Sequence, residues 1–277
     1  MSLNLSTAVA VVTGAASGIG RAVSLALAAR GTALALADRD ADGLEATAER
    51  ARAAGVAVSQ HAFDVTDAEA VAALPDAVLA AHGRATVLVN NAGVSLVGRF
   101  EEVTMEEFRW LLEVNLFGVV GLTKAFLPTL LAQRRAQIVN VSSLFGIVAP
   151  AEQVAYATSK FAVRGFSEAL RHELEGTGVG VTVVHPGGVR TAIATAARTA
   201  SAADPDEATR QMEQFTALAL TMAPEKAAAG IVRAVERRKN RALIGADARA
   251  GDALARALPA GYWRLLRGQF EKLSGRR

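Results

Sequence analysis

The chain has 277 residues, of which 51% are hydrophobic and 21% are charged, and it contains 24 glycines and no cysteine. This composition supports a folded core and excludes a disordered chain. Without cysteine there are no disulfides and no thiolate chemistry, and a cytoplasmic location fits by default. The four histidines show no ligand spacing, so we expect no metal.

The net charge of +3 is unevenly distributed along the chain. From Arg233 onward there are twelve Lys and Arg residues against four Asp and Glu, a balance of +8, and residues 1–232 carry −5. Because the basicity belongs to the tail, it does not indicate nucleic-acid binding by the main domain. No uncharged apolar run reaches the roughly 18 residues of a membrane span, and residues 1–7 lack the cationic start of a signal peptide.

A strand, a glycine-rich turn and a helix that feeds a second strand open the chain. A short β-branched run spans residues 8–13 and leads into Gly14-Ala-Ala-Ser-Gly18-Ile-Gly20, an apolar helical stretch and a second strand over residues 33–37. In such a βαβ unit the glycines allow a tight turn and let backbone N–H groups approach a phosphate at the helix N-terminus. The spacing G-x-x-x-G-x-G differs from the G-x-G-x-x-G of most dinucleotide folds, and such turns also occur simply to pack a helix on a strand.

An acidic residue, Asp38, closes the second strand, 24 residues after Gly14. A carboxylate there can hydrogen-bond ribose hydroxyls and would repel a 2′-phosphate, which favours NAD over NADP. The alternative is that Asp38 caps the next helix. Arg39 keeps NADP open, because an arginine there could pair with a 2′-phosphate.

Helices and strands continue to alternate to the end of the main domain. Capping-box patterns, Thr66-x-x-Glu69 and Thr104-x-x-Glu107, predict two helix starts. The alternation predicts one doubly wound, seven-stranded parallel sheet with helices on both faces. The further predicted helices span about 40–54, 66–81, 104–132, 156–175 and 224–238, and the further strands span 56–63, 86–90, 137–142, 180–185 and 241–245. Ligands of such sheets bind beyond the carboxyl ends of the strands, where the motifs of this chain lie.

A tyrosine and a lysine, Tyr156 and Lys160, are four residues apart and share a helical face. An ordinary phenol, with a pKa of roughly 10, is a poor acid or base at neutral pH, but a nearby ammonium favours the phenolate and lowers that pKa. A serine pair, Ser142-Ser143, ends thirteen residues before the tyrosine and could hydrogen-bond a substrate oxygen. By itself the Tyr–Lys pair is more often an ordinary half-exposed helical pair.

Six motifs in this order resemble those of the short-chain dehydrogenase/reductases. They run from about Leu5 to Thr191 and are Thr13-Gly-x-x-x-Gly-Ile-Gly20, Asn90-Asn-Ala-Gly93, Asn115, Ser143, Tyr156-x-x-x-Lys160 and Pro186-Gly-x-Val-x-Thr191. The resemblance implies a Rossmann domain over residues 1–250, activity as an NAD(P)-dependent alcohol dehydrogenase or ketone reductase, and homodimers or homotetramers formed through the long helices that contain Asn115 and Tyr156.

The resemblance also implies roles for single residues. Tyr156 would be the general acid/base, and Ser143 would polarise the substrate carbonyl or alcohol. Lys160 would bind the nicotinamide ribose and, together with the positive charge of the bound oxidised nicotinamide, depress the pKa of Tyr156. Asn115 would hold a water in a proton relay that reaches Lys160. The implied cofactor contacts are Gly14, Ser17, Gly18, Ile19 and Gly20 at the pyrophosphate, Asp38 and Arg39 at the adenosine ribose, Asp64 and Val65 at the adenine, Asn91, Ala92 and Gly93 along the cofactor, and Pro186, Gly187, Val189 and Thr191 at the carboxamide. Members that prefer NADP often have a basic residue where this chain has Ser17, so NAD is favoured.

The substrate region is apolar. Residues 192–222 would form a mobile lid, and Glu152 is the one charge between the serine pair and Tyr156. We therefore expect a neutral alcohol or ketone, although these side chains could equally cover the core. The expected substrate contacts are Leu144, Phe145, Val148, Val154, Met212 and Phe215.

A basic amphipathic helical extension is predicted over residues 251–277. Apolar residues recur there at helical spacing, with basic residues around them. We expect the extension to pack over the substrate mouth or a neighbouring subunit, and contact with an anionic membrane surface is the less favoured alternative. The apolar residues are Tyr262, Trp263, Leu266, Phe270 and Leu273, and the basic ones are Arg264, Arg267, Lys272, Arg276 and Arg277.

Two other kinds of protein share parts of this pattern. A catalytically idle dinucleotide-binding sensor or scaffold would be expected to lose a member of the set Asn115, Ser143, Tyr156 and Lys160, and none is lost here. Epimerases and dehydratases of nucleotide sugars usually show G-x-x-G-x-x-G and a larger C-terminal domain, which this sequence lacks.

Overall fold

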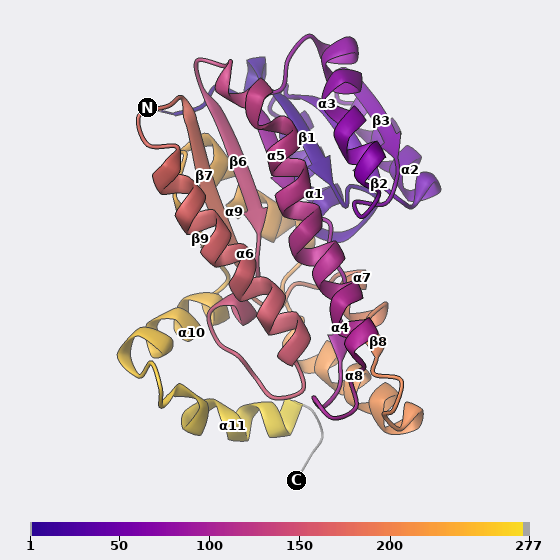
Figure 1. Ribbon diagram of the computed structural model, residues 1–277, viewed down its shortest axis with the longest axis vertical. Helices are drawn as coiled ribbons and strands as arrows, with labels where there is room; N and C mark the ends of the chain where they lie inside the picture. The colour runs from indigo at the N-terminus through magenta and orange to yellow at the C-terminus, as the bar shows by residue number, and fades with distance from the viewer. Residues whose placement is uncertain (1, 274–277) are drawn as a thin grey trace.

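A parallel sheet is the central element of the fold. The computed structural model describes residues 2–273, in which seven parallel strands pair in the order β3-β2-β1-β4-β6-β7-β9 (Figure 1). The strands are β1 (Val9–Thr13), β2 (Ala33–Asp38), β3 (Val58–Ala62), β4 (Val87–Asn90), β6 (Ala136–Val141), β7 (Val179–Pro186) and β9 (Arg241–Ile244). The predicted doubly wound seven-stranded sheet is confirmed. The strand order reverses between β1 and β4, and in such sheets a ligand crevice opens at that reversal.

Helices cover both faces of the sheet. One face carries α1 (Gly18–Ala28), α2 (Ala41–Arg52) and α9 (Pro224–Glu236), and the other carries α3 (Ala68–His82), α5 (Gly118–Leu131) and α6 (Val154–Glu173). Because both faces are covered, every residue of β1, β4 and β6 is buried.

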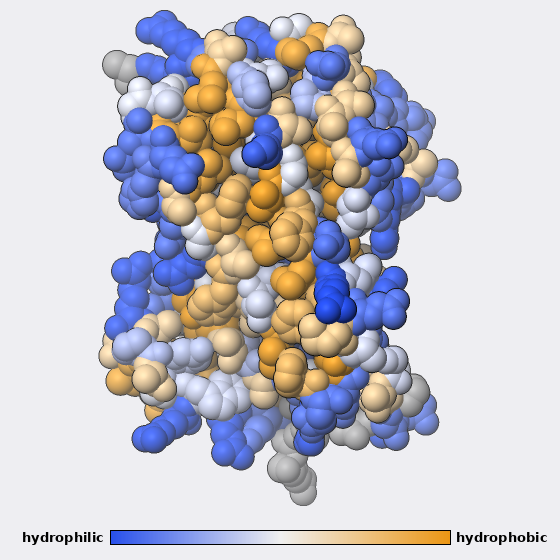
Figure 2. All heavy atoms as spheres, viewed as in Figure 1, coloured by the Kyte–Doolittle hydropathy of each residue, from blue (hydrophilic) through white to orange (hydrophobic). Residues whose placement is uncertain are grey.

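The outer sides of α5 and α6 carry apolar side chains. Figure 2 shows apolar atoms gathered along the middle of this face, over α5 and α6. Leu131 on α5 and Val154 and Phe161 on α6 are exposed, and Phe117, in the turn before α5, is 53% exposed. These four residues are called the apolar strip below.

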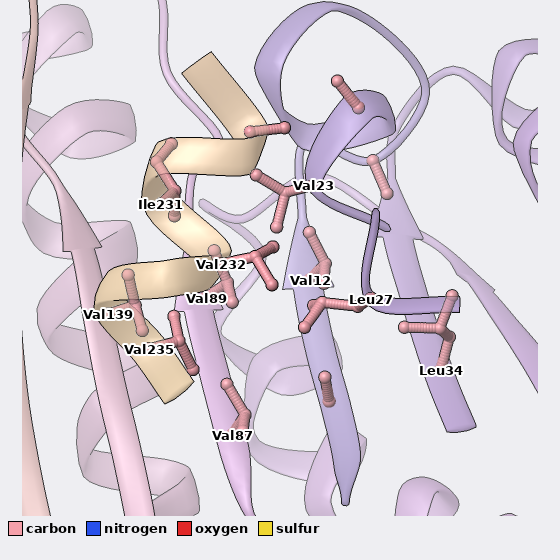
Figure 3. Packing of buried hydrophobic residues seen from close by; sticks show 14 of the residues in the cluster. Val12, Val23, Leu27, Leu34, Val87, Val89, Val139, Ile231, Val232 and Val235 are labelled. Carbon is pink, nitrogen blue, oxygen red and sulfur yellow. The ribbon is translucent and has the colours of Figure 1, made fainter. Parts of the chain in front are cut away.

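The larger core lies under α1 and α9, which pack against each other. Val23 and Leu27 of α1 and Ile231 of α9 point toward Val12 and Val89 of the sheet (Figure 3). Burial of each such side chain contributes roughly 1.5–3 kcal/mol. This packing fixes the N-terminus of α1, and with it the glycine-rich turn, against the ends of β1 and β4.

One long helix is interrupted by a π turn. The helix begins as α4 (Met105–Leu112), continues through the π turn η2 (Glu113–Phe117) and becomes α5. By length and composition Met105–Leu131 could cross a membrane, but 44% of its apolar window is buried in the protein. The helix packs on α3, β4 and β6, which accounts for its apolar composition.

One of the two predicted capping boxes is correct. Thr104 and Glu107 cap α4 reciprocally, as expected. The start predicted at Thr66 is wrong, because Asp67 is the N-cap of α3 and its carboxylate accepts from the N–H groups of Glu69 and Ala70. The Thr66 hydroxyl instead donates to Asp64. A carboxylate one residue closer to the helix satisfies the same free N–H groups.

A group of short elements lies beyond the carboxyl ends of the strands (Figure 1). The group comprises β5 (Leu96–Val97), η3 (Leu144–Gly146), α7 (Ala192–Thr195), β8 (Arg198–Thr199), α8 (Pro205–Ala219), α10 (Ala246–Ala257) and α11 (Tyr262–Leu273). The predicted extension thus contains two helices, and the first begins at Ala246. The Arg198 guanidinium lies 3.7 Å from the centre of the Trp110 ring, which ties β8 to α4.

Candidate active site

A cavity of about 1260 Å³ lies at the carboxyl edge of the sheet, where the strand order reverses. Its walls are the loops after β1, β2, β4, β6 and β7, together with parts of α8, α10 and α11. Most residues that the sequence predicts for cofactor and substrate line this one cavity. The predicted cofactor residues in its lining are Gly14, Ser17, Gly18, Ile19, Asp38, Arg39, Asp64, Val65, Asn91, Ala92, Gly93, Tyr156, Lys160, Pro186, Gly187, Val189 and Thr191.

The glycine-rich turn is closed by backbone contacts that exclude side chains. Gly14 and Gly18 have φ values of +65° and +53°, which favour glycine. A Cβ on Gly20 would overlap the Gly14 carbonyl oxygen, so Gly20 packs α1 on the turn. Gly20 is not part of the described lining of the cavity, and its predicted cofactor contact stays a prediction. Ser17 is the N-cap of α1, and its side chain makes no capping hydrogen bond.

Asp38 and Arg39 are held in different ways at the end of β2. One carboxylate oxygen of Asp38 accepts from the Ala16 N–H at 2.9 Å, and the other accepts from the Asp40 N–H at 3.1 Å. The half-exposed Arg39 guanidinium lies 3.6 Å from the Asp64 carboxylate. Burial would raise the pKa of Asp64, but hydrogen bonds from Thr66 and the charge of Arg39 lower it below its ordinary value.

The loops after β1 and β4 are tied together. The Thr13 hydroxyl oxygen accepts from the N–H groups of Asn91 and Ala92, both at 3.1 Å. The Asn91 side chain donates to the carbonyls of Thr13 at 3.0 Å and Gly14 at 3.2 Å. These bonds keep the walls of the cavity at a fixed separation beside the glycine turn.

Ser143, Tyr156 and Lys160 meet at one wall of the cavity, as predicted. The Ser143 hydroxyl accepts from the Phe145 N–H at 3.1 Å and is hydrogen-bonded to the Tyr156 hydroxyl. The Lys160 Nζ lies 5.5 Å from the centre of the Tyr156 ring and donates to the Val141 carbonyl at 3.2 Å. Lys160 is only 3% exposed, so its ammonium is held in place by the end of β6.

The predicted lowering of the Tyr156 pKa is not found in the protein alone. Burial raises the pKa of Tyr156 to about 12, and the hydrogen bond with Ser143 opposes this only in part. Burial also lowers the pKa of Lys160 to about 8. A low-polarity surrounding disfavours both charged forms, and this effect outweighs the attraction between them.

Asn115 lies in the π turn and is fully buried. Its side-chain oxygen accepts from the Val94 N–H at 2.8 Å, and its amide donates to the Val94 carbonyl at 2.9 Å and to Ser159 at 3.1 Å. It is absent from the described lining of the cavity. Asn115 therefore joins the loop after β4 to α6, one residue before Lys160.

Five of the six predicted substrate residues line the cavity beyond Tyr156. They are Leu144, Phe145, Val148, Met212 and Phe215. The sixth, Val154, is 41% exposed and is not part of the described lining, so the structure does not bring it to the cavity. It is two residues before Tyr156 on α6, and an α-helix turns by about 200° over two residues, so the two side chains point in opposite directions.

The apolar face of α11 closes the cavity on the side away from the sheet. The Phe270 ring lies 5.9 Å from that of Phe145, which lies 6.2 Å from Tyr156. The Tyr262 hydroxyl accepts from the Ala149 N–H at 3.0 Å. Leu266 also lines the cavity. Arg276 and Arg277 lie outside the described residues, as do the side chains of Lys272 and Leu273.

Sequence reasoning missed the contribution of α10. Gly251 and Leu254 line the cavity, and a Cβ on Gly251 would press on Leu144. Asp247 accepts from the Gly188 N–H at 2.6 Å and so holds the loop after β7. The available sequence feature was Gly245 as the N-cap with an acidic residue, Asp247, in the first turn of α10, which is typical of a helix start.

The fold and the cavity define a doubly wound α/β protein with a Ser–Tyr–Lys group at the strand ends. A model of the short chain dehydrogenase family matches residues 8–202. SadH of Mycobacterium tuberculosis is 44% identical over 260 residues, which is 93% of each chain. The chain belongs to the short chain dehydrogenase family, a family of oxidoreductases.

Two solved structures show the same architecture. A short chain dehydrogenase/reductase from Burkholderia phymatum, in complex with NAD, has a TM-score of 0.85 at 32% identity, covering 93% of this chain and 95% of that one. An alcohol dehydrogenase from the archaeon Thermococcus sibiricus, complexed with 5-hydroxy-NADP, has a TM-score of 0.71 at 32% identity, covering 85% and 93%. Similar proteins thus bind either form of the cofactor.

Proposed function

We propose that the protein is an NAD-dependent oxidoreductase that interconverts a neutral, apolar secondary alcohol and its ketone. The observation that carries this proposal is the hydrogen-bonded Ser143–Tyr156 pair beside Lys160 at the wall of a strand-end cavity. Two hydroxyls beside an amine can hold a substrate oxygen and exchange a proton with it. An idle sensor or scaffold would not need such a group.

The glycine turn fits the pyrophosphate of a dinucleotide. A side chain at Gly14 would collide with Asn91 and Ala92 of the loop after β4, and one at Gly20 would collide with the Gly14 carbonyl. Backbone N–H groups and Ser17, whose side chain makes no capping hydrogen bond, therefore form the surface of the turn at the N-terminus of α1. Asp38 would take the adenosine ribose, and Asp64 and Val65 would flank the adenine. When bound, the cofactor supplies or accepts the hydride.

The protein residues would handle the proton and the position of the substrate oxygen. In alcohol oxidation, Tyr156 would accept the hydroxyl proton as a phenolate, and the Ser143 hydroxyl would hold the same oxygen. In ketone reduction, Tyr156 would return a proton to the carbonyl oxygen. Because burial alone raises the pKa of Tyr156, a positive charge close to the ring, on Lys160 and on the oxidised nicotinamide, must lower it in the working complex.

Asp38 supports NAD as the preferred form. Its carboxylate is fixed at the end of β2, where a 2′-phosphate would meet a negative charge. Arg39 is near Asp64, and this ion pair competes with the pairing of Arg39 to a phosphate. NADP is the alternative form.

An apolar substrate is supported by the wall around Tyr156. Leu144, Phe145 and Val148 approach from the loop after β6, Met212 and Phe215 from α8, and Leu254, Leu266 and Phe270 from α10 and α11. A cytoplasmic homodimer or homotetramer completes the proposal, and the apolar strip on α5 and α6 supports self-association.

A substrate panel tests the proposed function. Steroid alcohols, acyclic diols and aryl ketones are to be screened with NAD and NADP by nicotinamide absorbance, with Tyr156→Phe as the control. We expect turnover of a neutral alcohol–ketone pair and a loss of at least roughly a hundredfold in Tyr156→Phe. Activity that survives Tyr156→Phe would contradict the proposed mechanism.

A further inference from the structure

A buried histidine that the proposed mechanism does not use lies directly behind the serine of the site. His185 is the penultimate residue of β7, and its side chain is fully buried. Its Nδ1 lies 2.9 Å from the carbonyl oxygen of Ser143. Its Nε2 is buried without a hydrogen-bond partner among the residues that the structure describes.

The hydrogen bond to Ser143 fixes the protonation state of the ring. A carbonyl oxygen only accepts, so the imidazole proton must be on Nδ1. Burial lowers the pKa of His185 to about 4; the hydrogen bond to Ser143 opposes this, and the nearby charges of Arg241 and Arg164 add to it. The Asp252 carboxylate acts in the opposite direction but is itself paired with Arg241 and Arg256. At neutral pH the ring is neutral and donates through Nδ1.

The backbone at Ser143 is held by two successive residues of β7. The Ser142 N–H donates to the Val184 carbonyl at 2.8 Å, and His185 then donates to the Ser143 carbonyl. On the other side, the Ser142 hydroxyl donates to the Lys160 carbonyl at 2.8 Å. A side chain leaves its Cα in a direction fixed by the backbone atoms. Holding the Ser143 carbonyl therefore holds the Ser143 backbone, and with it the position of the Ser143 hydroxyl.

The imidazole is not needed to fill space. The preceding strand residues Val181, Val183 and Val184 are buried aliphatic side chains, and an aliphatic residue at 185 would leave no buried nitrogen unpaired. An unpaired buried polar atom is unfavourable, so the ring lowers stability relative to an aliphatic side chain of that shape. Its specific contribution is the Nδ1–H donor.

We propose that His185 is a positioning residue, whose Nδ1–H donor holds the Ser143 carbonyl and thereby aims the Ser143 hydroxyl at Tyr156 and the substrate oxygen. This inference rests on the proposed role of Tyr156. Since the hydrogen bond from Ser143 lowers the pKa of Tyr156, loss of the His185 donor should raise that pKa.

The test compares two variants of nearly the same shape. His185→Asn places an amide N–H close to where the imidazole Nδ1 lies, and His185→Leu has no donor. The chain contains two tyrosines, so both variants are made in a Tyr262→Phe background in which Tyr156 is the sole tyrosine. The pKa of Tyr156 is then followed directly by phenolate absorbance in protein saturated with NAD, or with NADP if the panel shows that cofactor to be preferred. This measurement requires no substrate.

We expect His185→Asn to match the Tyr262→Phe parent. In His185→Leu the Tyr156 pKa should rise by roughly half a unit to one unit. Its kcat for the alcohol that the panel identifies should fall roughly five- to tenfold, the size expected when one hydrogen bond to a reacting group is weakened. The KM for the cofactor should not change.

Equal Tyr156 pKa values and equal kcat in the Asn and Leu variants would overturn the proposal. If His185→Leu does not fold, as judged by circular dichroism and cofactor binding, His185→Gln replaces it, because its longer side chain moves the donor away from the Ser143 carbonyl. The Gln variant should then show the losses expected of Leu, and a match to Asn would overturn the proposal. Failure of the proposed function is separate: activity retained in Tyr156→Phe would refute it, while the spectroscopic comparison would still report on His185.

Discussion

Burial moves the pKa values of Tyr156 and Lys160 in the directions that keep both side chains uncharged. The phenol keeps its proton, and the amine loses its proton at about pH 8. Such a pair is a poor base until a further positive charge arrives close to the ring. In the proposed mechanism, proton transfer is therefore coupled to binding of the oxidised cofactor, since that state would bring the charge.

At the residue scale, cofactor choice can be tested at Asp38. Asp38→Asn removes the charge but keeps an oxygen that can accept from the Ala16 N–H. We expect kcat/KM with NADP, relative to NAD, to rise by roughly tenfold, because the repulsion of a 2′-phosphate is gone. Steady-state kinetics with both cofactors measure this ratio. Arg39→Ala is the control. The fold-change that it causes in kcat/KM with NAD should be smaller than the fold-change that Asp38→Asn causes in the NADP-to-NAD ratio of kcat/KM. A wild-type preference for NADP would refute the assignment.

His185 also makes stability depend on pH. Its pKa in the folded protein is about 4, below the ordinary 6.5, so the unfolded chain binds more protons between these values. The contribution to the free energy of unfolding is complete above about pH 6.5 and is lost as pH falls toward 4, by an amount on the order of 3 kcal/mol.

The urea midpoint of wild type should fall more steeply than that of His185→Asn over this pH range. His61 and His82, whose pKa values burial also lowers, remain in both proteins and cancel in the comparison. If the urea midpoints of the two proteins fell equally with pH, His185 would not be neutral in the folded protein.

At the scale of single elements, α11 closes part of the cavity that we propose holds the substrate. Its apolar side faces Phe145 and the cavity, and among its described side chains Leu265 is the large apolar one that points to solvent, at 63% exposure. This leaves little apolar surface for a membrane. The hydrogen bond from the Ala149 N–H to Tyr262 fixes the start of the helix.

Phe270→Ala should widen the cavity beside Phe145. Because the ring contributes apolar contact to a bulky substrate, we expect KM for the alcohol found in the panel to rise roughly tenfold, with kcat nearly unchanged. Leu265→Ala, on the solvent side of the same helix, is the matched control and should leave KM unchanged. An equal KM in the two variants would show that α11 does not contact the substrate.

At the scale of the whole molecule, the proposed self-association can be tested at the apolar strip. Its exposed residues come from α5, α6 and the π turn before α5, and apolar atoms gather over α5 and α6 (Figure 2). We expect Phe161→Glu, which places a charge in the strip, to reduce the mass measured by sedimentation velocity to that of a smaller assembly. Phe100→Glu changes an equally large exposed side chain outside α5 and α6, at 60% exposure, and should have no effect. An unchanged mass for Phe161→Glu would place the interface elsewhere.

The sheet and most of the cavity could be predicted from the sequence, because strand-end motifs such as Gly14 to Gly20 act locally. Individual contacts between distant segments could not be predicted, although the packing of the C-terminal extension over the cavity was expected. Asp247 acts on Gly188, 59 residues away, and α10 reaches Leu144 across the site. The rise of the Tyr156 pKa in the protein alone could not be predicted either, since burial depends on the surrounding structure and the Tyr–Lys spacing does not report it. Val154 shows that a residue close in sequence to the site can lie on the far side of its helix.

The π turn at Glu113–Phe117 adds one residue to a helical turn, and this changes the phase of the long helix. Before the turn, Leu111 packs with Leu96 and Ala155 under the site; after it, Leu122, Phe126 and Leu130 pack on the sheet. One residue corresponds to about 100° of rotation about the helix axis. Deleting a residue from the turn would restore a regular α-helix, but α4 would be rotated out of its contacts or α5 out of the core. The protein would then gain a regular hydrogen-bond ladder and lose the alignment of the catalytic wall with the sheet, so a more regular helix would yield a less active enzyme.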